Sequence, residues 1–155
     1  MTLGIAPSVL DPSLFIPDLK ARRKEPALAE MVAVAHRSGA VREPAPLLDL
    51  LVLRERLGST AIGKGVAMPH ARSLTIARPQ LLIGRSSRGI EWDAPDGQPA
   101  TLLLLVLSPS EWSDEAHHAF LARAGAVARL QRNRQRLLEA PTFEAVATVL
   151  REVTL

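Results

Sequence analysis

Cysteine is absent from all 155 residues, so the chain can form no disulfide and has no thiol for nucleophilic catalysis or zinc binding. Tyrosine is absent too, and aromatic residues make up only 3% of the sequence. Proteins that hold single-stranded nucleic acids stack the bases on aromatic side chains. The two absences therefore argue against an oxidising compartment and against nucleic acid as a partner.

Long apolar segments and blocks of like charge are also missing. The longest apolar run covers residues 100–107, whereas a membrane-spanning helix needs about 20 residues. The N-terminus has no basic stretch followed by a long apolar one, so we expect no signal peptide. The formal net charge is +3, but arginines are scattered among acidic residues, as is typical of a solvated surface. We therefore expect a cytoplasmic protein without membrane insertion.

Apolar side chains are plentiful, at 47% of the residues, which is enough for the core of one domain. Their spacing predicts helices over residues 25–38, 45–57, 112–130, 134–139 and 142–153, the last with Thr142 as its N-cap. Short apolar runs predict strands over residues 13–19, 65–68, 81–86 and 101–107, the last one buried on both faces. This order indicates an α/β sandwich, a mixed β-sheet flanked by α-helices, as a single domain over residues 1–155.

The chain has four histidines, His36, His70, His117 and His118. His36 lies in an alanine-rich predicted helix without a polar motif, which favours a structural role. His117 and His118 are adjacent at the start of a predicted helix, where neighbouring side chains diverge by about 100°. The two cannot share one metal ion, and we expect no metal site.

His70 belongs to the stretch GSTAIGKGVAMPHAR, residues 58–72. Glycine amides can receive an anion, and an imidazole can attack or hold a phosphoryl group. The loop lacks the Lys-Ser/Thr ending of a nucleotide-binding P-loop, and no strand-GxGxxG-helix order for a dinucleotide is present, so we expect no cofactor. On these residues alone, an ordinary histidine at the end of a strand remains an open alternative.

A longer stretch, LRERLGSTAIGKGVAMPHAR, resembles the active-site segment of the enzyme IIA domains of the mannitol/fructose class in the sugar phosphotransferase system. The family pattern R-E-x-x-G-S-T-x-I-G-x-G-x-A-x-P-H is matched from Arg54 to His70. The segments WDAPDGQPATLLLLVLSPS and HHAFLAR are similar to later parts of the family. The chain departs from the usual family residues at Ala61, Lys64 and Ala71.

The resemblance implies a phosphoryl relay without metal or nucleotide. His70 would accept a phosphoryl group from a histidine-containing phosphocarrier protein and pass it to a IIB domain, or hold it as a regulatory signal as in the nitrogen-regulatory branch. Such a protein is a histidine phosphotransferase component and not a conventional turnover enzyme. The alternative function is a regulatory interaction domain, whose phosphorylation state controls the binding of a regulatory target protein without sugar transport.

The same resemblance assigns further site residues. His117 matches the second histidine of the family, with His118 as the alternative. Ser59 and Thr60 offer hydroxyl donors to a phosphate, and Gly63 and Gly65 offer backbone amides. Arg72 follows the nucleophile closely and gives electrostatic support or faces solvent.

Overall fold

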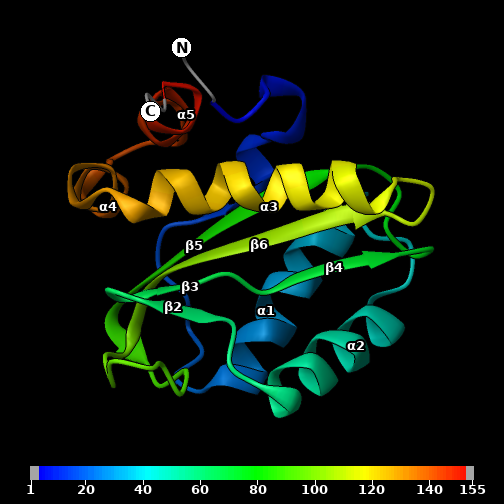
Figure 1. The fold of residues 1–155 in the computed structure, drawn as a ribbon, viewed down its shortest axis with the longest axis horizontal. Helices are drawn as coiled ribbons and strands as arrows, with labels where there is room; N and C mark the ends of the chain where they lie inside the picture. The colour runs from blue at the N-terminus through cyan, green and yellow to red at the C-terminus, as the bar shows by residue number, and fades with distance from the viewer. Residues whose placement is uncertain (1–3, 153–155) are drawn as a thin grey trace.

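The computed structural model describes residues 4–152, in which an open mixed sheet lies between two layers of helices (Figure 1). The six strands are β1 (Phe15–Ile16), β2 (Ala61–Gly63), β3 (Val66–Ala67), β4 (His70–Ser73), β5 (Gln80–Ile90) and β6 (Ala100–Pro109). The five α-helices are α1 (Lys24–Arg37), α2 (Pro44–Leu57), α3 (Asp114–Arg129), α4 (Gln131–Glu139) and α5 (Phe143–Arg151). Two short 3-10 helices, Pro7–Val9 and Pro12–Leu14, precede β1.

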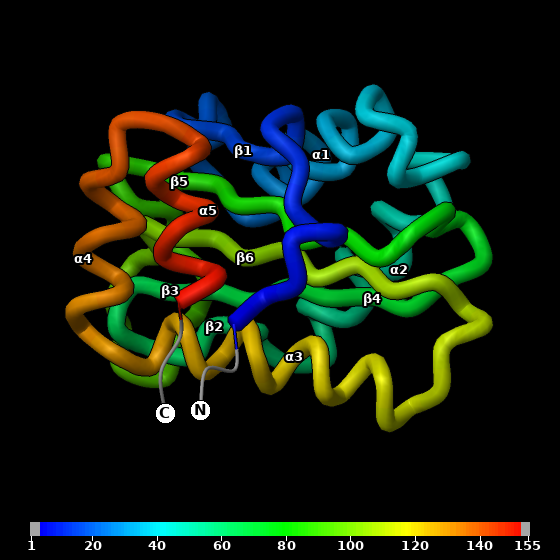
Figure 2. The backbone as a smooth tube through the Cα atoms, turned by 90° about the horizontal axis from the view of Figure 1, so that it is seen from above, coloured from blue at the N-terminus to red at the C-terminus, as the bar shows by residue number. Residues whose placement is uncertain are grey.

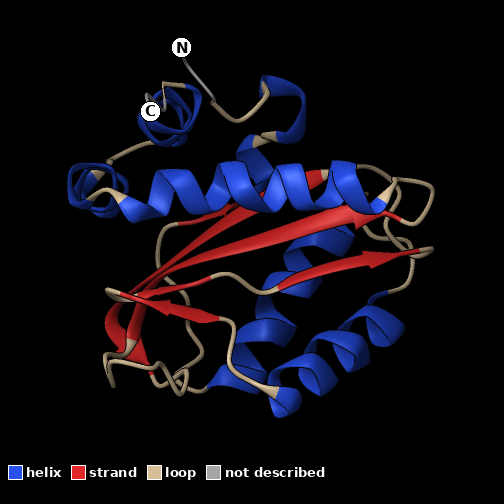
Figure 3. Cartoon of the chain, viewed as in Figure 1, coloured by secondary structure: helices blue, strands red, loops and turns tan. Residues whose placement is uncertain are grey.

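Strand β6 lies in the middle of the sheet, in which the hydrogen-bonded order is β1-β5-β6-β3-β2 and β4 also pairs with β6. Figure 3 shows the strands with helices on both sides of them. Strand β6 pairs antiparallel with β5 on one side. On its other side it pairs parallel with β3, opposite Leu102 and Leu103, and then with β4, which begins opposite Val106. The chain between β3 and β4 therefore runs along one edge of β6 and delivers His70 beside the second half of that strand.

The side chains of β6 alternate between two apolar cores. Leu103, Leu105 and Leu107 pack with α1 and α2 on one face. Leu102, Leu104 and Val106 pack with α3, α4 and α5 on the other. All six are fully buried, which confirms the prediction of a strand buried on both faces. Figure 2 shows α5 lying over the strands, α3 running along one side of the sheet, and the first described residues of the chain beside α5.

The predicted α/β sandwich is confirmed, with corrections to its strands. The helix predictions agree with α1 to α5 to within a few residues, although residue 153 lies outside the described range. Thr142 caps α5, since its side chain accepts from the Ala145 amide at 3.2 Å. Within residues 13–19 only Phe15–Ile16 is a strand, because Pro12 starts a 3-10 turn. The strands β2 and β4 were not predicted.

His70 begins a strand, whereas the sequence suggested that a strand ends there. Pro69 has no amide to give to a ladder, so β3 stops before it and pairing resumes at His70. No helix within residues 4–152 has both the length and the apolarity needed to cross a lipid bilayer.

Candidate functional site

His70 is half-buried at the start of β4, with its side chain on the α3 face of the sheet. Successive side chains of a strand alternate between faces. Ala71 packs into the core formed with α1 and α2, so His70 and Arg72 both lie on the opposite face. The sheet thus presents an imidazole and a guanidinium side by side toward the start of α3.

The hydrogen bond of the His70 ring fixes its tautomer. Its Nδ1 lies 3.0 Å from the carbonyl oxygen of Met68. A carbonyl can only accept, so Nδ1 carries the proton and donates it. In the neutral ring the lone pair is then on Nε2, which makes Nε2 the nucleophilic atom.

His117 is the residue that the fold brings next to His70. The two ring centroids are 5.9 Å apart, with the ring planes tilted by 49°. Ser113 caps the start of α3 by accepting from the Ala116 amide, and the helix then buries His117 under its first turn. The Nδ1 of His117 lies 2.8 Å from the Oγ of Ser108, a fully buried serine near the end of β6. Both rings are therefore held by partners from the sheet.

The pKa of His117 is lowered from its usual value of 6.5, first by burial and then by the charges of His70, Arg72 and His118. The Asp114 carboxylate acts in the opposite direction. Burial disfavours a charged ring, and nearby positive groups add to the same effect. His117 is thus kept neutral near pH 7, able both to accept and to donate a hydrogen bond.

His118 is exposed on α3, and its ring lies 5.9 Å from that of His117. Two adjacent helical residues point in different directions, and here only His117 turns toward the sheet. Within residues 4–152, His, Asp and Glu side chains form no group of three or more that could hold a metal ion.

Arg72 reaches from β4 to the start of α3. It donates to the carbonyl oxygen of Trp112 at 3.0 Å and forms an ion pair with Asp114 at 2.5 Å. Its charge also contributes to the lowered pKa of His117. These contacts tie the Arg72 side chain to the start of α3, and electrostatic support of His70 stays a prediction.

The hydroxyls of Ser59 and Thr60 are engaged elsewhere. Ser59 Oγ donates to the Trp92 carbonyl oxygen. Thr60 Oγ1 donates to the Glu55 carboxylate and accepts from Trp92 Nε1 at 3.2 Å. Trp92 belongs to the core under α1 and α2, so the Thr60 hydroxyl points away from the face that carries His70. These contacts give the predicted phosphate-binding role of the two hydroxyls no support.

Gly63 and Gly65 flank the turn between β2 and β3 and are not brought to His70. Gly65 accepts from the amides of Thr101 and Leu102 at 2.8 and 3.0 Å. His70 pairs further along β6, with Val106, so the two positions are separated by about 13 Å at ~3.3 Å per strand residue. The anion bound at this turn is the Asp96 carboxylate, which accepts from the Lys64 amide at 2.8 Å. These positions give the expectation that the glycines surround a phosphate on His70 no support.

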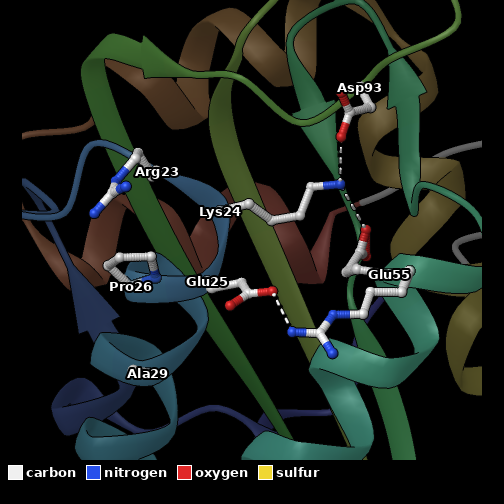
Figure 4. A pocket seen from close by; sticks show the side chains of 8 residues that line it. Arg23, Lys24, Glu25, Pro26, Ala29, Glu55 and Asp93 are labelled. Atoms are coloured by element: carbon white, nitrogen blue, oxygen red, sulfur yellow. Dashed lines mark hydrogen bonds and ion pairs between the residues drawn. The ribbon is translucent and has the colours of Figure 1, made fainter.

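A groove of about 690 Å³ lies between the start of α1 and the end of α2, and Figure 4 shows the side chains around it. An ion pair of 3.2 Å between Glu25 and Arg56 spans it. Lys24 lies deeper, within 3.1 Å of Asp93 and 3.5 Å of Glu55. His70 does not line this groove, but Glu55 belongs to both its wall and the network around Thr60.

Sequence reasoning missed Ser108 and any role for Glu55 beyond its match to the motif. Glu55 had a readable signal: with Leu47 and Leu51 it forms an i, i+4, i+8 row, and all three are buried on one face of α2. A carboxylate on a buried helical stripe must find donors. The sequence carried no signal for Ser108, because one serine at the end of an apolar run is ordinary.

The family model described as "Phosphoenolpyruvate-dependent sugar phosphotransferase system, EIIA 2" matches residues 8–153. The match covers nearly the whole chain, and the protein belongs to this family of phosphotransferase system IIA domains.

Relatives in the family include both transport and regulatory proteins. The chain is 29% identical over 135 residues to the PTS system fructose-specific EIIABC component of Bacillus subtilis, with 87% of this chain aligned to 21% of that protein. It is 34% identical over 139 residues to the nitrogen regulatory protein of Bradyrhizobium diazoefficiens, with 90% of each chain aligned. Among solved structures, nitrogen regulatory protein IIA-Ntr from Neisseria meningitidis superposes with a TM-score of 0.84 at 27% identity, covering 92% of this chain and 97% of that one.

Proposed function

We propose that this protein is a cytoplasmic phosphoryl relay, in which His70 accepts a phosphoryl group from a phosphohistidine carrier protein. It then passes the group to a IIB domain or holds it as a regulatory signal. The observation that carries this proposal is the hydrogen bond of 3.0 Å from His70 Nδ1 to Met68 O, which leaves Nε2 as the nucleophile. Membership of the EIIA family supports the same reaction class.

The transfer step is a displacement at phosphorus. The lone pair on Nε2 of His70 forms the new bond, while the bond from phosphorus to the carrier's imidazole nitrogen breaks and its electron pair returns to the carrier ring. The phosphorylated ring of His70 keeps its Nδ1 proton and becomes positively charged. A hydrogen bond from a charged donor is stronger than one from a neutral donor, so the Met68 carbonyl stabilises this state.

Neighbouring groups on α3 and β4 support the step. A phosphoryl group on Nε2 adds negative charge on the face that Arg72 and His117 share with His70. Preorganised donors aimed at developing charge stabilise it without reorganisation cost. The ring centroid distance of 5.9 Å between His70 and His117 leaves room for hydrogen bonding to a phosphoryl oxygen.

A regulatory function without sugar transport is the second candidate, and it is supported by the nitrogen-regulatory relatives, which align over nearly their whole length. Under this candidate, phosphorylation of His70 changes the affinity for a regulatory target protein.

A direct experiment incubates the chain with phosphoenolpyruvate, enzyme I and the phosphocarrier and measures acid-labile phosphate. We expect about one phosphate per chain in the wild type and none in His70→Ala. His36→Ala is the matched control, because His36 Nδ1 also lies close to a backbone carbonyl, that of Val41 at 2.9 Å. Full labelling of His70→Ala contradicts the proposal, and the rate at which an added IIB domain removes the phosphate separates transport from regulation.

A further inference from the structure

One backbone hydrogen bond beside His70 is diverted. Thr60 and Met68 lie opposite each other just outside the pairing of β2 with β3. In an antiparallel sheet, the two residues of a hydrogen-bonded pair donate their amides to each other's carbonyls. The Met68 amide does donate to the Thr60 carbonyl at 3.0 Å. The Thr60 amide, however, donates to Oε1 of Glu55 at 3.0 Å.

The diversion leaves the Met68 carbonyl without its usual strand partner. That carbonyl is the group that accepts from Nδ1 of His70 at 3.0 Å. A path of hydrogen bonds thus runs from the Glu55 carboxylate through both backbone groups of Thr60 to Met68 and on to the imidazole. This path connects a side chain of α2 with a ring that lies on the other face of the sheet.

Glu55 is held firmly in the position that captures the Thr60 amide. Glu55 as a whole residue is 7% exposed, and its carboxylate also accepts from the Thr60 hydroxyl. Lys24 lies 3.5 Å from Oε1 and is itself paired with Asp93 at 3.1 Å, as Figure 4 shows. A buried carboxylate with two donors and a nearby cation has few alternative arrangements.

We propose that Glu55 is a positioning residue for His70: by binding the Thr60 amide it reserves the Met68 carbonyl for Nδ1–H and so keeps the reactive lone pair on Nε2. The importance of that lone pair rests on the proposed function, but the positioning itself concerns the unphosphorylated protein. Glu55 does not touch the reacting atoms and acts through Thr60 and Met68.

Two substitutions at position 55 separate this role from general packing. Glu55→Met keeps the length of the side chain but has no oxygen, so the Thr60 amide is released to donate to Met68 O and compete with His70. Glu55→Gln keeps one oxygen that can accept from the Thr60 amide. The proposal therefore expects Glu55→Met to disturb His70 and Glu55→Gln to restore it.

The tautomer of His70 can be read by ¹⁵N NMR of the full chain without any phosphoryl donor. We expect Nδ1–H to predominate in the wild type and in Glu55→Gln. In Glu55→Met the ratio of Nδ1–H to Nε2–H should fall by about two- to twelvefold, the range expected for the loss of one neutral hydrogen bond. With phosphoramidate, a small phosphoryl donor, the ratio of Nε2-phosphate to Nδ1-phosphate should then fall by a similar factor.

Glu30→Met is the matched control, because Glu30 also accepts from backbone amides, those of Lys20 and Ala21 at 3.1 and 2.9 Å. It should lower stability and leave the His70 ratio unchanged. An unchanged ratio in folded Glu55→Met overturns the proposal. If that variant does not fold, Glu55→Ala decides, since it also removes the acceptor of the Thr60 amide, and a wild-type ratio there is equally fatal. If the ratio shifts in Glu55→Met but the wild type takes no phosphate from the carrier, the proposed function is wrong and the positioning role stands.

Discussion

The imidazoles of His70 and His117 face each other between β4 and α3, with their ring centroids 5.9 Å apart. Each ring is anchored through Nδ1, one to the Met68 carbonyl and the other to the Ser108 hydroxyl. The Nε2 atoms are therefore the ones left to meet a ligand. A phosphoryl group on one Nε2 would find the other as a hydrogen-bonding partner.

His117→Ala tests this partnership. Loss of one donor to the phosphoryl oxygens should slow onward transfer by about 10²–10³, the usual effect of removing one such donor. Loading should suffer less, because the attacking atom on His70 is untouched. Single-turnover kinetics of both steps give the comparison. His118→Ala should have almost no effect on either step. If His118→Ala slowed onward transfer more than His117→Ala, the exposed His118 would be the partner of the phosphoryl group.

The architecture could be predicted from the sequence, while much of the site could not. The continuous apolar run of β6 and the spacing of apolar residues in the helices are strong signals, so the sandwich could be predicted from them. The strand β4 reads HARS, too short and too polar for such a signal, and it forms because β6 offers an edge there. The glycines around Lys64 looked like an anion loop, and the structure fills that loop with the Asp96 carboxylate.

Acid should weaken the fold through His117. Its pKa lies below 6.5 in the folded protein and near that value in the unfolded chain, so the unfolded chain binds more protons between the two values. The stability that neutral His117 contributes at pH 7 is thus lost as the pH falls through 6.5. No more is lost once the pH is below the pKa of the folded state. Urea unfolding of wild type and His117→Gln from neutral to acidic pH measures this. On acidification the wild type should lose more free energy of unfolding than His117→Gln. Parallel pH dependences of the two proteins would contradict the prediction.

Arg72→Met should slow loading and transfer by about 10- to 100-fold, as expected for one hydrogen bond to a charged group. Asp114→Asn is the matched test, because it removes the ion-pair partner of Arg72 and leaves the guanidinium free to turn to the phosphoryl group. Asp114 is largely exposed, so this change should cost less than about 1 kcal/mol of stability and leave transfer as fast as in the wild type. Equal slowing by both variants would mean that Arg72 only holds the start of α3.

The turn between β2 and β3 needs glycine for its backbone conformation. Gly65 has φ of +79°, and an added Cβ would lie 3.1 Å from Oγ1 of Thr101. Gly97 has a similar φ of +74° with open space around it. A left-handed backbone is unfavourable for alanine, so Gly97→Ala should cost about 1 kcal/mol and Gly65→Ala up to about 3 kcal/mol. Urea midpoints measure both.

The same two variants decide whether the turn binds the phosphoryl group. Gly65 pairs with Thr101 and Leu102, well along β6 from Val106, where His70 begins β4. Folded Gly65→Ala should therefore accept phosphate from the carrier within about twofold of the wild-type rate, as Gly97→Ala does, because the amides of this turn do not reach Nε2. A tenfold or larger loss in Gly65→Ala alone, with its fold intact, would return the glycines to the phosphate site and show that the turn moves toward His70 during transfer.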